Sequence, residues 1–226
     1  MTNRQRRVRS DSHCVIAIDG PAASGKSTVA RELAARLGFV YVNSGAMYRA
    51  VTWYILENGI DPGNADRITA VIERAKISSE IVNNATRILI DGVDPTPYLR
   101  DARVNNEVSR VSAVPQVRRV LDENMRAYAR DHDLVVEGRD IGSVVFPDTP
   151  FKFYIDASPD VRQRRRAAEG QRDEILSRDR ADSSRVAAPL VIADDARVID
   201  SSHLTIDGVV GEIIGQLKMK GLAVDA

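Results

Sequence analysis

The chain has 226 residues, of which 43% are hydrophobic and 28% are charged, as is usual for a globular protein with one well-buried core. Lysine plus arginine and aspartate plus glutamate both total 32, so composition gives no reason to expect nucleic-acid or membrane binding. The single cysteine, Cys14, excludes an intrachain disulfide, and neither a membrane span of ~20 apolar residues nor a signal-peptide core is present, so we expect a cytoplasmic protein.

Residues 1–13 are polar and basic, with arginines at positions 4, 6, 7 and 9 against Asp11. A basic tail could contact nucleic acid. Short charge runs at a terminus are more typical of a disordered leader, however, and we predict a disordered basic leader here.

Short apolar segments alternate with amphipathic helices along most of the chain after the leader. The expected strands are residues 14–19, 39–42, 134–137, 151–155 and 197–199. The expected helices between and after them are residues 26–37, 45–57, 158–168, 172–182 and 205–219. Five buried strands alternating with helices predict an α/β fold with a five-stranded parallel sheet covered by helices on both faces. Ligands of such sheets bind beyond the C-terminal ends of the strands.

The pattern changes between residues 60 and 130. Residues 65–75 predict a helix, and residues 77–98 predict short antiparallel strands with turns at Asp91-Gly92 and Asp94-Pro95. Two more helices are expected at residues 103–112 and 115–131. We therefore predict that residues 60–130 form a small α+β insert in a core made of residues 14–59 and 131–226.

A phosphate-binding motif, G-x-x-x-x-G-K-S, links the first strand to the first helix. We call the motif together with the next residue the phosphate loop. It consists of Gly20, Pro21, Ala22, Ala23, Ser24, Gly25, Lys26, Ser27 and Thr28. Its backbone N–H groups and the helix N-terminus suit a phosphate, Lys26 can reach the β- and γ-phosphates, and the Ser27 hydroxyl can ligate Mg²⁺. The preceding strand and following helix disfavour the alternative of a merely tight turn. The motif predicts a nucleoside triphosphate site without naming the phosphate acceptor.

Three polar clusters lie at predicted strand ends or on helices that face them. They are Ser44, Tyr48 and Arg49 after residues 39–42, Arg139 and Asp140 after residues 134–137, and Arg178, Asp182 and Arg185 on one helical face. Each has an ordinary structural explanation, such as a helix cap at Ser44, a surface ion pair or a solvated charged face. Together with Lys26 they bring positive charge to one sheet edge, which is what phosphoryl transfer mainly needs. The arginine-rich segment 162–180 would suit a lid that closes over ATP.

Five stretches of the sequence together form a pattern typical of one enzyme family. They are IDGPAASGKST (18–28), NSGAMYRA (43–50), VEGRDIGSVVFPD (136–148), KFYIDAS (152–158) and RDRADSSRVAAPL (178–190). Together they closely resemble the bacterial cytidylate kinases, the (d)CMP kinases of the nucleoside monophosphate kinase group. The resemblance implies transfer of the γ-phosphoryl group of ATP to CMP or dCMP with Mg²⁺. It also implies a P-loop kinase core, a monophosphate-binding insert and a short mobile lid at about residues 160–185. We expect the protein to be a monomer.

The resemblance also implies roles for individual residues. Ser44, Tyr48 and Arg49 would hold the monophosphate and its base side, and Ser109 and Arg118 would contact cytosine and phosphate, with Ser112 an alternative to Ser109. Arg139 would bind phosphate, and Asp140, Asp182, Arg178 and Arg185 would bind the sugar and phosphates. The catalytic residues would be Lys26, Arg139, Arg178 and Arg185. Arg185 would also help to neutralise the negative charge in the transition state of phosphoryl transfer. The individual arginines between Ser158 and Arg178 receive no role.

Two alternatives remain open on the sequence alone. One is a P-loop kinase of another small acceptor, such as UMP, AMP or shikimate. The other is a nucleotide-controlled binding module, in which hydrolysis switches a partner. The three histidines show no metal-ligand spacing, so we expect no metal site beyond nucleotide-bound Mg²⁺.

Overall fold

The computed structural model describes residues 13–168, Asp179 and residues 190–224. The predicted leader therefore lies outside the described residues except for His13. The predicted helix at 172–182 lies outside them except for Asp179. None of the described helices is long and apolar enough to cross a membrane.

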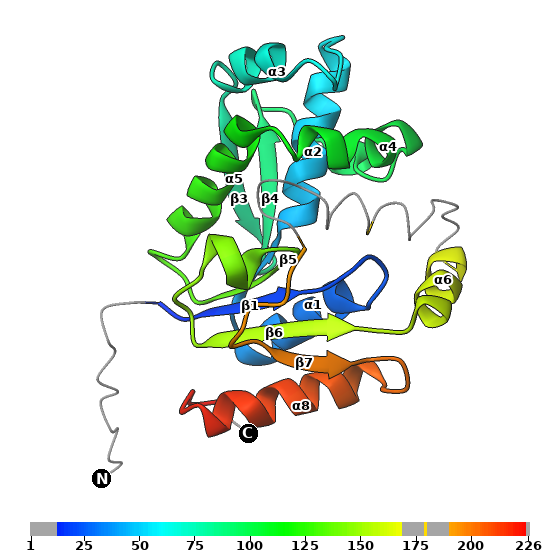
Figure 1. Ribbon diagram of the computed structural model, residues 1–226. Coiled ribbons are helices and arrows are strands. Elements are labelled where there is room, and N and C mark those ends of the chain that lie inside the picture. Colours follow the sequence, from blue (N-terminus) through cyan, green and yellow to red (C-terminus); the bar gives the residue numbers. More distant parts are fainter. Residues whose placement is uncertain (1–12, 169–178, 180–189, 225–226) are drawn as a thin grey trace.

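One sheet runs through the molecule in the strand order β3-β4-β2-β5-β1-β6-β7 (Figure 1). The five predicted core strands are all present, as β1 (Val15–Asp19), β2 (Val40–Asn43), β5 (Leu134–Gly138), β6 (Phe151–Asp156) and β7 (Arg197–Asp200). They pair in parallel with one another, as predicted.

The prediction of a five-stranded sheet is wrong in its count, because the described residues form a sheet of seven strands. The additional pair is an antiparallel hairpin of β3 (Ile77–Val82) and β4 (Ala85–Ile90), which the sequence analysis placed in a separate insert. The outer edge of β2 would otherwise leave backbone groups unpaired. The hairpin pairs with it, as the Tyr41 N–H donates to the Asn84 carbonyl at 2.8 Å.

Helices cover both faces of the sheet, and each face has its own apolar cluster. One face packs against α1 (Lys26–Leu37) and α8 (Ile206–Met219). The other packs against α2 (Ser44–Glu57), α3 (Ala65–Ile72), α4 (Ala102–Val111) and α5 (Pro115–Tyr128). Alternate residues of β1 divide between them: Ile16 and Ile18 join the first cluster and Ala17 joins the second, as a period of two requires.

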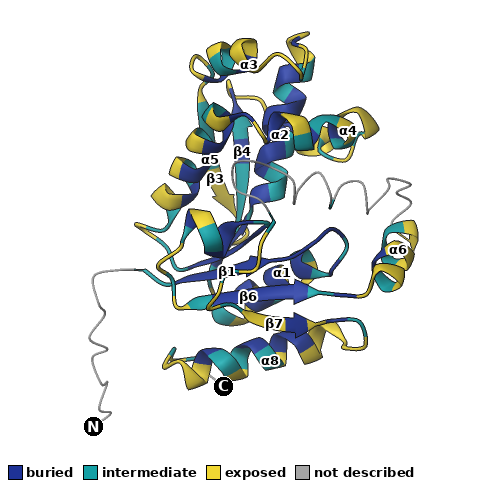
Figure 2. Ribbon diagram, in the orientation of Figure 1, coloured by how far each residue is buried: buried dark blue, intermediate teal, exposed yellow. Residues whose placement is uncertain are grey.

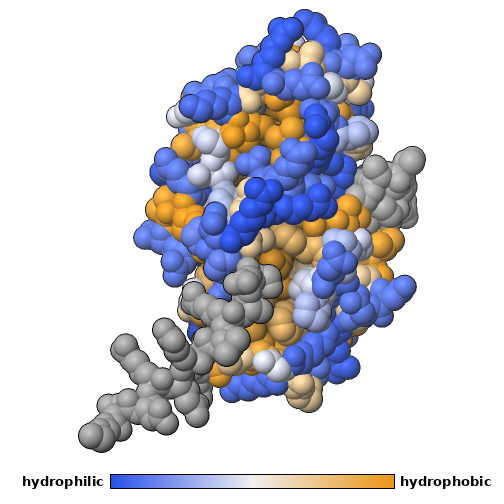
Figure 3. Space-filling model, turned by 90° about the vertical axis from the view of Figure 1, so that its left-hand side faces the viewer, coloured by the Kyte–Doolittle hydropathy of each residue, from blue (hydrophilic) through white to orange (hydrophobic). Residues whose placement is uncertain are grey.

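Burial follows these layers. Figure 2 shows buried strands at the centre and helices that are buried on their inner side and exposed on their outer side. Figure 3, which views the molecule from the left-hand side of Figure 1, shows a largely hydrophilic surface with smaller hydrophobic patches between. The helix α6 (Pro159–Ala168) follows β6 at the edge of this body and is mostly exposed.

The segment between α2 and β5 packs into the cluster on the α2 face, sharing Ile68, Ile90 and Leu121 with core residues of β1 and β2. Its hairpin turn is Asn83-Asn84, with φ of 51° and 57°, which the sequence analysis did not identify. The predicted turn at Asp91-Gly92 is present after β4, also with positive φ. A short 3₁₀ turn, η1 (Thr96–Tyr98), precedes α4.

The sheet register brings three strand ends together. Asp19 at the end of β1 lies opposite Gly138 of β5, and Glu137 lies opposite Asn43 of β2. The phosphate loop, the start of α2 and the residues after β5 therefore begin side by side at the C-terminal edge of the sheet, where ligands of parallel sheets bind.

Candidate active site

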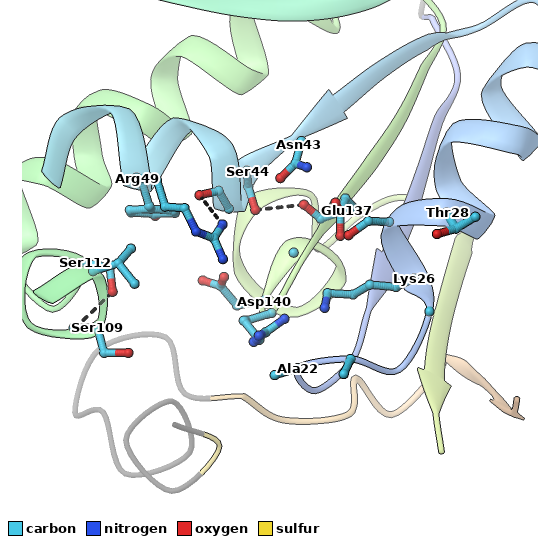
Figure 4. A pocket seen from close by; sticks show the side chains of 18 of the residues that line it. Ala22, Lys26, Thr28, Asn43, Ser44, Arg49, Ser109, Ser112, Glu137 and Asp140 are labelled. Carbon is cyan, nitrogen blue, oxygen red and sulfur yellow. Dashed lines mark hydrogen bonds between the residues drawn. The ribbon is translucent and has the colours of Figure 1, made fainter. Parts of the chain in front are cut away.

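A cleft of about 190 Å³ opens at this edge of the sheet (Figure 4). Its lining comes from the phosphate loop, the start of α2, the end of α4, the first turns of α5, the end of β5 with the residues that follow it, and α6. The predicted site residues that line it are Ala22, Ala23, Gly25, Lys26, Ser27, Thr28, Ser44, Tyr48, Arg49, Ser109, Arg118, Arg139 and Asp140. In Figure 4, Lys26, Arg49 and Asp140 reach into the same space from three different elements. The fold therefore brings together groups that lie more than a hundred positions apart in the sequence.

The phosphate loop has the backbone geometry that its glycines predict. Gly20 has a φ of +152°, and a Cβ built there would lie 2.1 Å from the Ile155 carbonyl oxygen, so no larger residue fits. Gly25 is left-handed and starts α1, whose first residue is Lys26. The Lys26 ammonium group is buried and donates to the Pro21 carbonyl at 3.0 Å.

Arginines from outside the loop bind its carbonyl oxygens. They are Arg139 on Gly20 (2.9 Å), Arg162 on Ala22 (3.2 Å) and Arg165 on Ser24 (3.1 Å). Arg162 also forms an ion pair with Asp179, whose other carboxylate oxygen accepts the Ala22 N–H at 3.1 Å. Neither Arg162 nor Arg165 had a predicted role. Their positions show that α6 supports the phosphate loop directly.

On the opposite wall, Arg118 of α5 forms a buried ion pair with Asp140, and both side chains are at most 6% exposed. The Arg118 guanidinium also lies 5.4 Å from the centre of the Tyr48 ring, a cation–π contact. A second acid, Asp122, lies nearby, and burial raises its pKa to about 6 although the positive charge of Arg118 opposes that rise. Arg118 is thus the positive centre of a buried cluster.

The start of α2 differs from one expectation. The residue that caps the helix is Asn43, whose side-chain oxygen accepts the Ala46 N–H at 2.8 Å, and not Ser44. The Ser44 hydroxyl instead donates to the Glu137 carbonyl at 2.8 Å, which ties α2 to the end of β5. Arg49 donates to the Gly45 carbonyl at 2.8 Å, and this bond holds its guanidinium along the cleft wall (Figure 4).

Ser109 in the last turn of α4 and Ser112 directly after that helix both line the cleft. Ser112 is only 3% exposed, and its hydroxyl donates to the Ser109 carbonyl at 3.1 Å. Ser109 is half-buried. The geometry therefore favours Ser109 as the one that meets a ligand and Ser112 as part of the local structure.

Comparison with known proteins identifies the protein family. A family model described as cytidylate kinase matches residues 16–219. The chain belongs to the cytidylate kinase family. The cytidylate kinase of Streptomyces avermitilis is 41% identical over 92% of this chain and 94% of that protein. The cytidylate kinase of Corynebacterium efficiens is 44% identical over 90% of this chain and 94% of that protein. The family match spans the core strands and the segment between α2 and β5 alike.

Three of the residues carried over from the family pattern, Arg178, Asp182 and Arg185, lie outside the described residues. Arg166 of α6 also lines the cleft and was not predicted.

Two carboxylates that received no role from the sequence lie at the strand ends. Glu137 is buried and accepts a hydrogen bond from the Tyr41 hydroxyl at 2.8 Å. Asp19 is 6% exposed, and both of its oxygens accept backbone N–H groups, at Ile141 and Gly142. Burial raises the pKa of Asp19 to about 7, against the lowering effect of these two hydrogen bonds. A charged residue ending an apolar strand was the available signal for both.

The cleft lining fits a nucleotide-bound Mg²⁺. Ser27 in the first turn of α1 and the carboxylate of Glu137 supply oxygen, the ligand type that Mg²⁺ prefers. Among the described residues no group of three or more histidine, cysteine, aspartate or glutamate side chains could hold an ion by itself. Phosphate oxygens and water would have to complete the coordination.

Proposed function

We propose that the protein transfers the γ-phosphoryl group of ATP to CMP or dCMP, giving CDP or dCDP. The observation that carries the proposal is that the phosphate loop and the arginines of the acceptor side line the same cleft. The names of its relatives support cytidylate as the acceptor.

On the donor side, the loop amides and the N-terminus of α1 would hold the β- and γ-phosphates of ATP, with Lys26 beside them. Ser27 and Glu137 would hold Mg²⁺, which when bound neutralises charge on the β- and γ-phosphates. Arg139 already lies against the loop through Gly20, so it would meet the phosphoryl group between donor and acceptor.

On the acceptor side, Ser44, Tyr48 and Arg49 would hold the monophosphate and its base side, and Ser109 and Arg118 would contact cytosine and phosphate. Asp140 would bind the sugar and is held in place by Arg118. Arg178, Asp182 and Arg185 would complete the set from outside the described residues. The buried polar groups of this wall suit base selection, because a wrong base would leave them unpaired.

Several finer features belong to the same proposal. Residues 60–130 would form the monophosphate-binding insert, and residues 160–185 would form the lid. The sequence-based expectations of a monomer and of a cytoplasmic location stay predictions.

The proposal is tested by measuring ATP consumption with CMP, dCMP, UMP, AMP and shikimate as separate acceptors in the presence of Mg²⁺. We expect turnover with CMP and dCMP well above that with the others. Turnover with UMP or AMP equal to that with CMP would remove the claim of cytidylate specificity. Slow ATP hydrolysis that CMP does not accelerate would point instead to a nucleotide-controlled binding module.

A further inference from the structure

Asp19 ends β1 directly before the phosphate loop and contacts the loop that carries Arg139 and Asp140. Its Oδ1 accepts the Ile141 N–H at 2.8 Å, and its Oδ2 accepts the Gly142 N–H at 2.8 Å. The carboxylate is 6% exposed, so these hydrogen bonds are shielded from competing water.

The two amides belong to the start of a π-helical turn, η2 (Ile141–Val145), which follows Asp140. The first N–H groups of any helical turn have no partner within the turn. Asp19 supplies that partner from a different strand. It therefore fixes where the turn begins, and with it the backbone of the preceding Arg139 and Asp140.

A second contact closes a ring around the same point. Arg139 donates to the carbonyl of Gly20, the residue that follows Asp19, at 2.9 Å. A closed series of contacts results. Asp19 accepts two hydrogen bonds from η2, η2 follows Arg139 and Asp140 directly, and the Arg139 guanidinium donates back to the phosphate loop. Close packing adds to this, since a Cβ on Gly142 would lie 3.4 Å from Asp19 Oδ2 and 3.1 Å from Lys152 Cγ.

We propose that Asp19 is a positioning residue that holds Arg139 and Asp140, on the acceptor side, at a fixed place relative to the phosphate loop on the donor side. The proposal rests on the proposed function, because it assigns Asp19 a part in aligning the donor and acceptor of that reaction. Phosphoryl transfer depends mainly on alignment and charge, and a displacement of about 1 Å can cost on the order of 100-fold in rate.

The arrangement requires a carboxylate and not merely a polar residue. Both partners are N–H donors, so both side-chain atoms must be acceptors. In the variant Asp19→Asn, one of the two amides would face a donor NH₂ group. Protonation of Asp19 would likewise place an O–H donor opposite one of the two amides. Burial raises the pKa of Asp19 to about 7.

The charged and titratable groups around Asp19 come from three sides. They are Lys26 of α1, Arg139 and Asp140 after β5, and Lys152 and Tyr154 of β6. Asp140 raises the pKa of Asp19 and Lys26 lowers it, and both effects are smaller than that of burial. Activity is accordingly expected to increase as pH rises through about 7.

The test compares the full-length wild type with Asp19→Asn and with Asp131→Asn as a control. A further variant, Gly142→Ala, would place a methyl group 3.1 Å from Lys152 Cγ and 3.4 Å from Asp19 Oδ2, and so crowds the start of η2. Asp131 is an exposed acid far from the cleft lining. For each we would measure kcat and KM for CMP, the Kd of ATP, the pH profile of kcat, and the thermal unfolding midpoint.

For Asp19→Asn we expect kcat to fall about 10- to 100-fold while the Kd of ATP stays within about threefold of wild type. The acid limb near pH 7 should disappear, leaving the limb from the second ionisation of the substrate phosphate at about pH 6. Asp131→Asn should behave as wild type. If Asp19→Asn does not fold, Gly142→Ala decides by the same kcat-against-Kd criterion.

Variants with kcat within about twofold of wild type, or with ATP binding weakened as much as kcat, would overturn the role of Asp19. A wild type that does not phosphorylate CMP would refute the proposed function instead. The two failures are therefore distinguishable.

Discussion

At the scale of single residues, the buried Arg118–Asp140 pair is the contact with the largest expected effect on stability. Its side chains are at most 6% exposed, and Asp122 lies close to the same guanidinium. Removing Arg118 alone, as in Arg118→Met, would leave two buried acids without their positive partner. We expect the free energy of unfolding to fall by about 3–5 kcal/mol, measured by urea denaturation.

The double variant Arg118→Met/Asp140→Asn should recover part of that loss, since the uncompensated charge at position 140 is gone. Arg103→Met is the matched control, because Arg103 pairs with Glu57 at the surface and is 51% exposed. Equal losses for Arg118→Met and Arg103→Met would contradict a buried, coupled cluster.

Ser109 and Ser112 separate binding from local structure. Ser109→Ala should raise KM for CMP and leave stability nearly unchanged, since its half-buried side chain lines the cleft. Ser112→Ala should lower the free energy of unfolding by about 1 kcal/mol, because its buried hydroxyl donates to Ser109. Steady-state kinetics and urea denaturation of both variants give the comparison. The reverse pattern would reassign the ligand contact to Ser112.

At the scale of elements, Gly38 at the end of α1 and Gly20 at the start of the phosphate loop differ in what surrounds them. Gly38 ends the helix in a left-handed conformation with nothing near its missing Cβ, so Gly38→Ala should cost about 1–2 kcal/mol of stability and leave kinetics intact. Gly20→Ala would place a methyl group 2.1 Å from the Ile155 carbonyl and should abolish ATP binding. Calorimetric titration with ATP and thermal unfolding would show this; unchanged ATP binding by Gly20→Ala would contradict the loop geometry.

Local patterns predicted the elements well. The helix at residues 26–37 has the predicted bounds, because its apolar stripe and Gly38 are both encoded nearby. Asn83-Asn84, the cap at Asn43 and the turn η2 were missed, since short polar residues and a five-residue turn leave little periodicity. The joining of the hairpin to β2 was also missed, as strand pairing depends on which edges remain open after folding.

The site was predictable to the extent that its residues follow strands or sit in a motif. Lys26, Arg49 and Arg139 were found in this way. Arg162 was not, because its contact with Ala22 joins positions 140 residues apart. Long-range contacts of this kind leave no local trace in one sequence.

At the scale of the whole molecule, the two acids with raised pKa values make stability depend on pH. Burial raises the pKa of Asp19 to about 7 and that of Asp122 to about 6, from an ordinary value of 3.8. Between the ordinary and raised values the folded state holds protons that the unfolded state has released. The stability contributed by these groups is therefore fully present below the ordinary value and is lost as pH rises through the raised values.

We expect the free energy of unfolding to be lower at about pH 8 than at about pH 5, and the dependence to be weaker in Asp122→Asn. Acids with lowered pKa values, such as Asp91 and Asp200, change the free energy of unfolding only at pH values below the ordinary pKa of aspartate. Urea denaturation across this interval provides the measurement. A free energy of unfolding that rises towards pH 8 would contradict raised pKa values for Asp19 and Asp122.

Taken as a whole, the molecule is proposed to hold ATP on the phosphate loop and cytidylate on the opposite wall of the same cleft. The most direct measurement is a competition, in which ATP and Mg²⁺ are supplied with equal concentrations of CMP, UMP and AMP and the diphosphate products are separated. The ratio of initial rates gives the ratio of kcat/KM values. The account predicts CDP as the dominant product, and a mixture in which UDP or ADP forms as fast as CDP would contradict it.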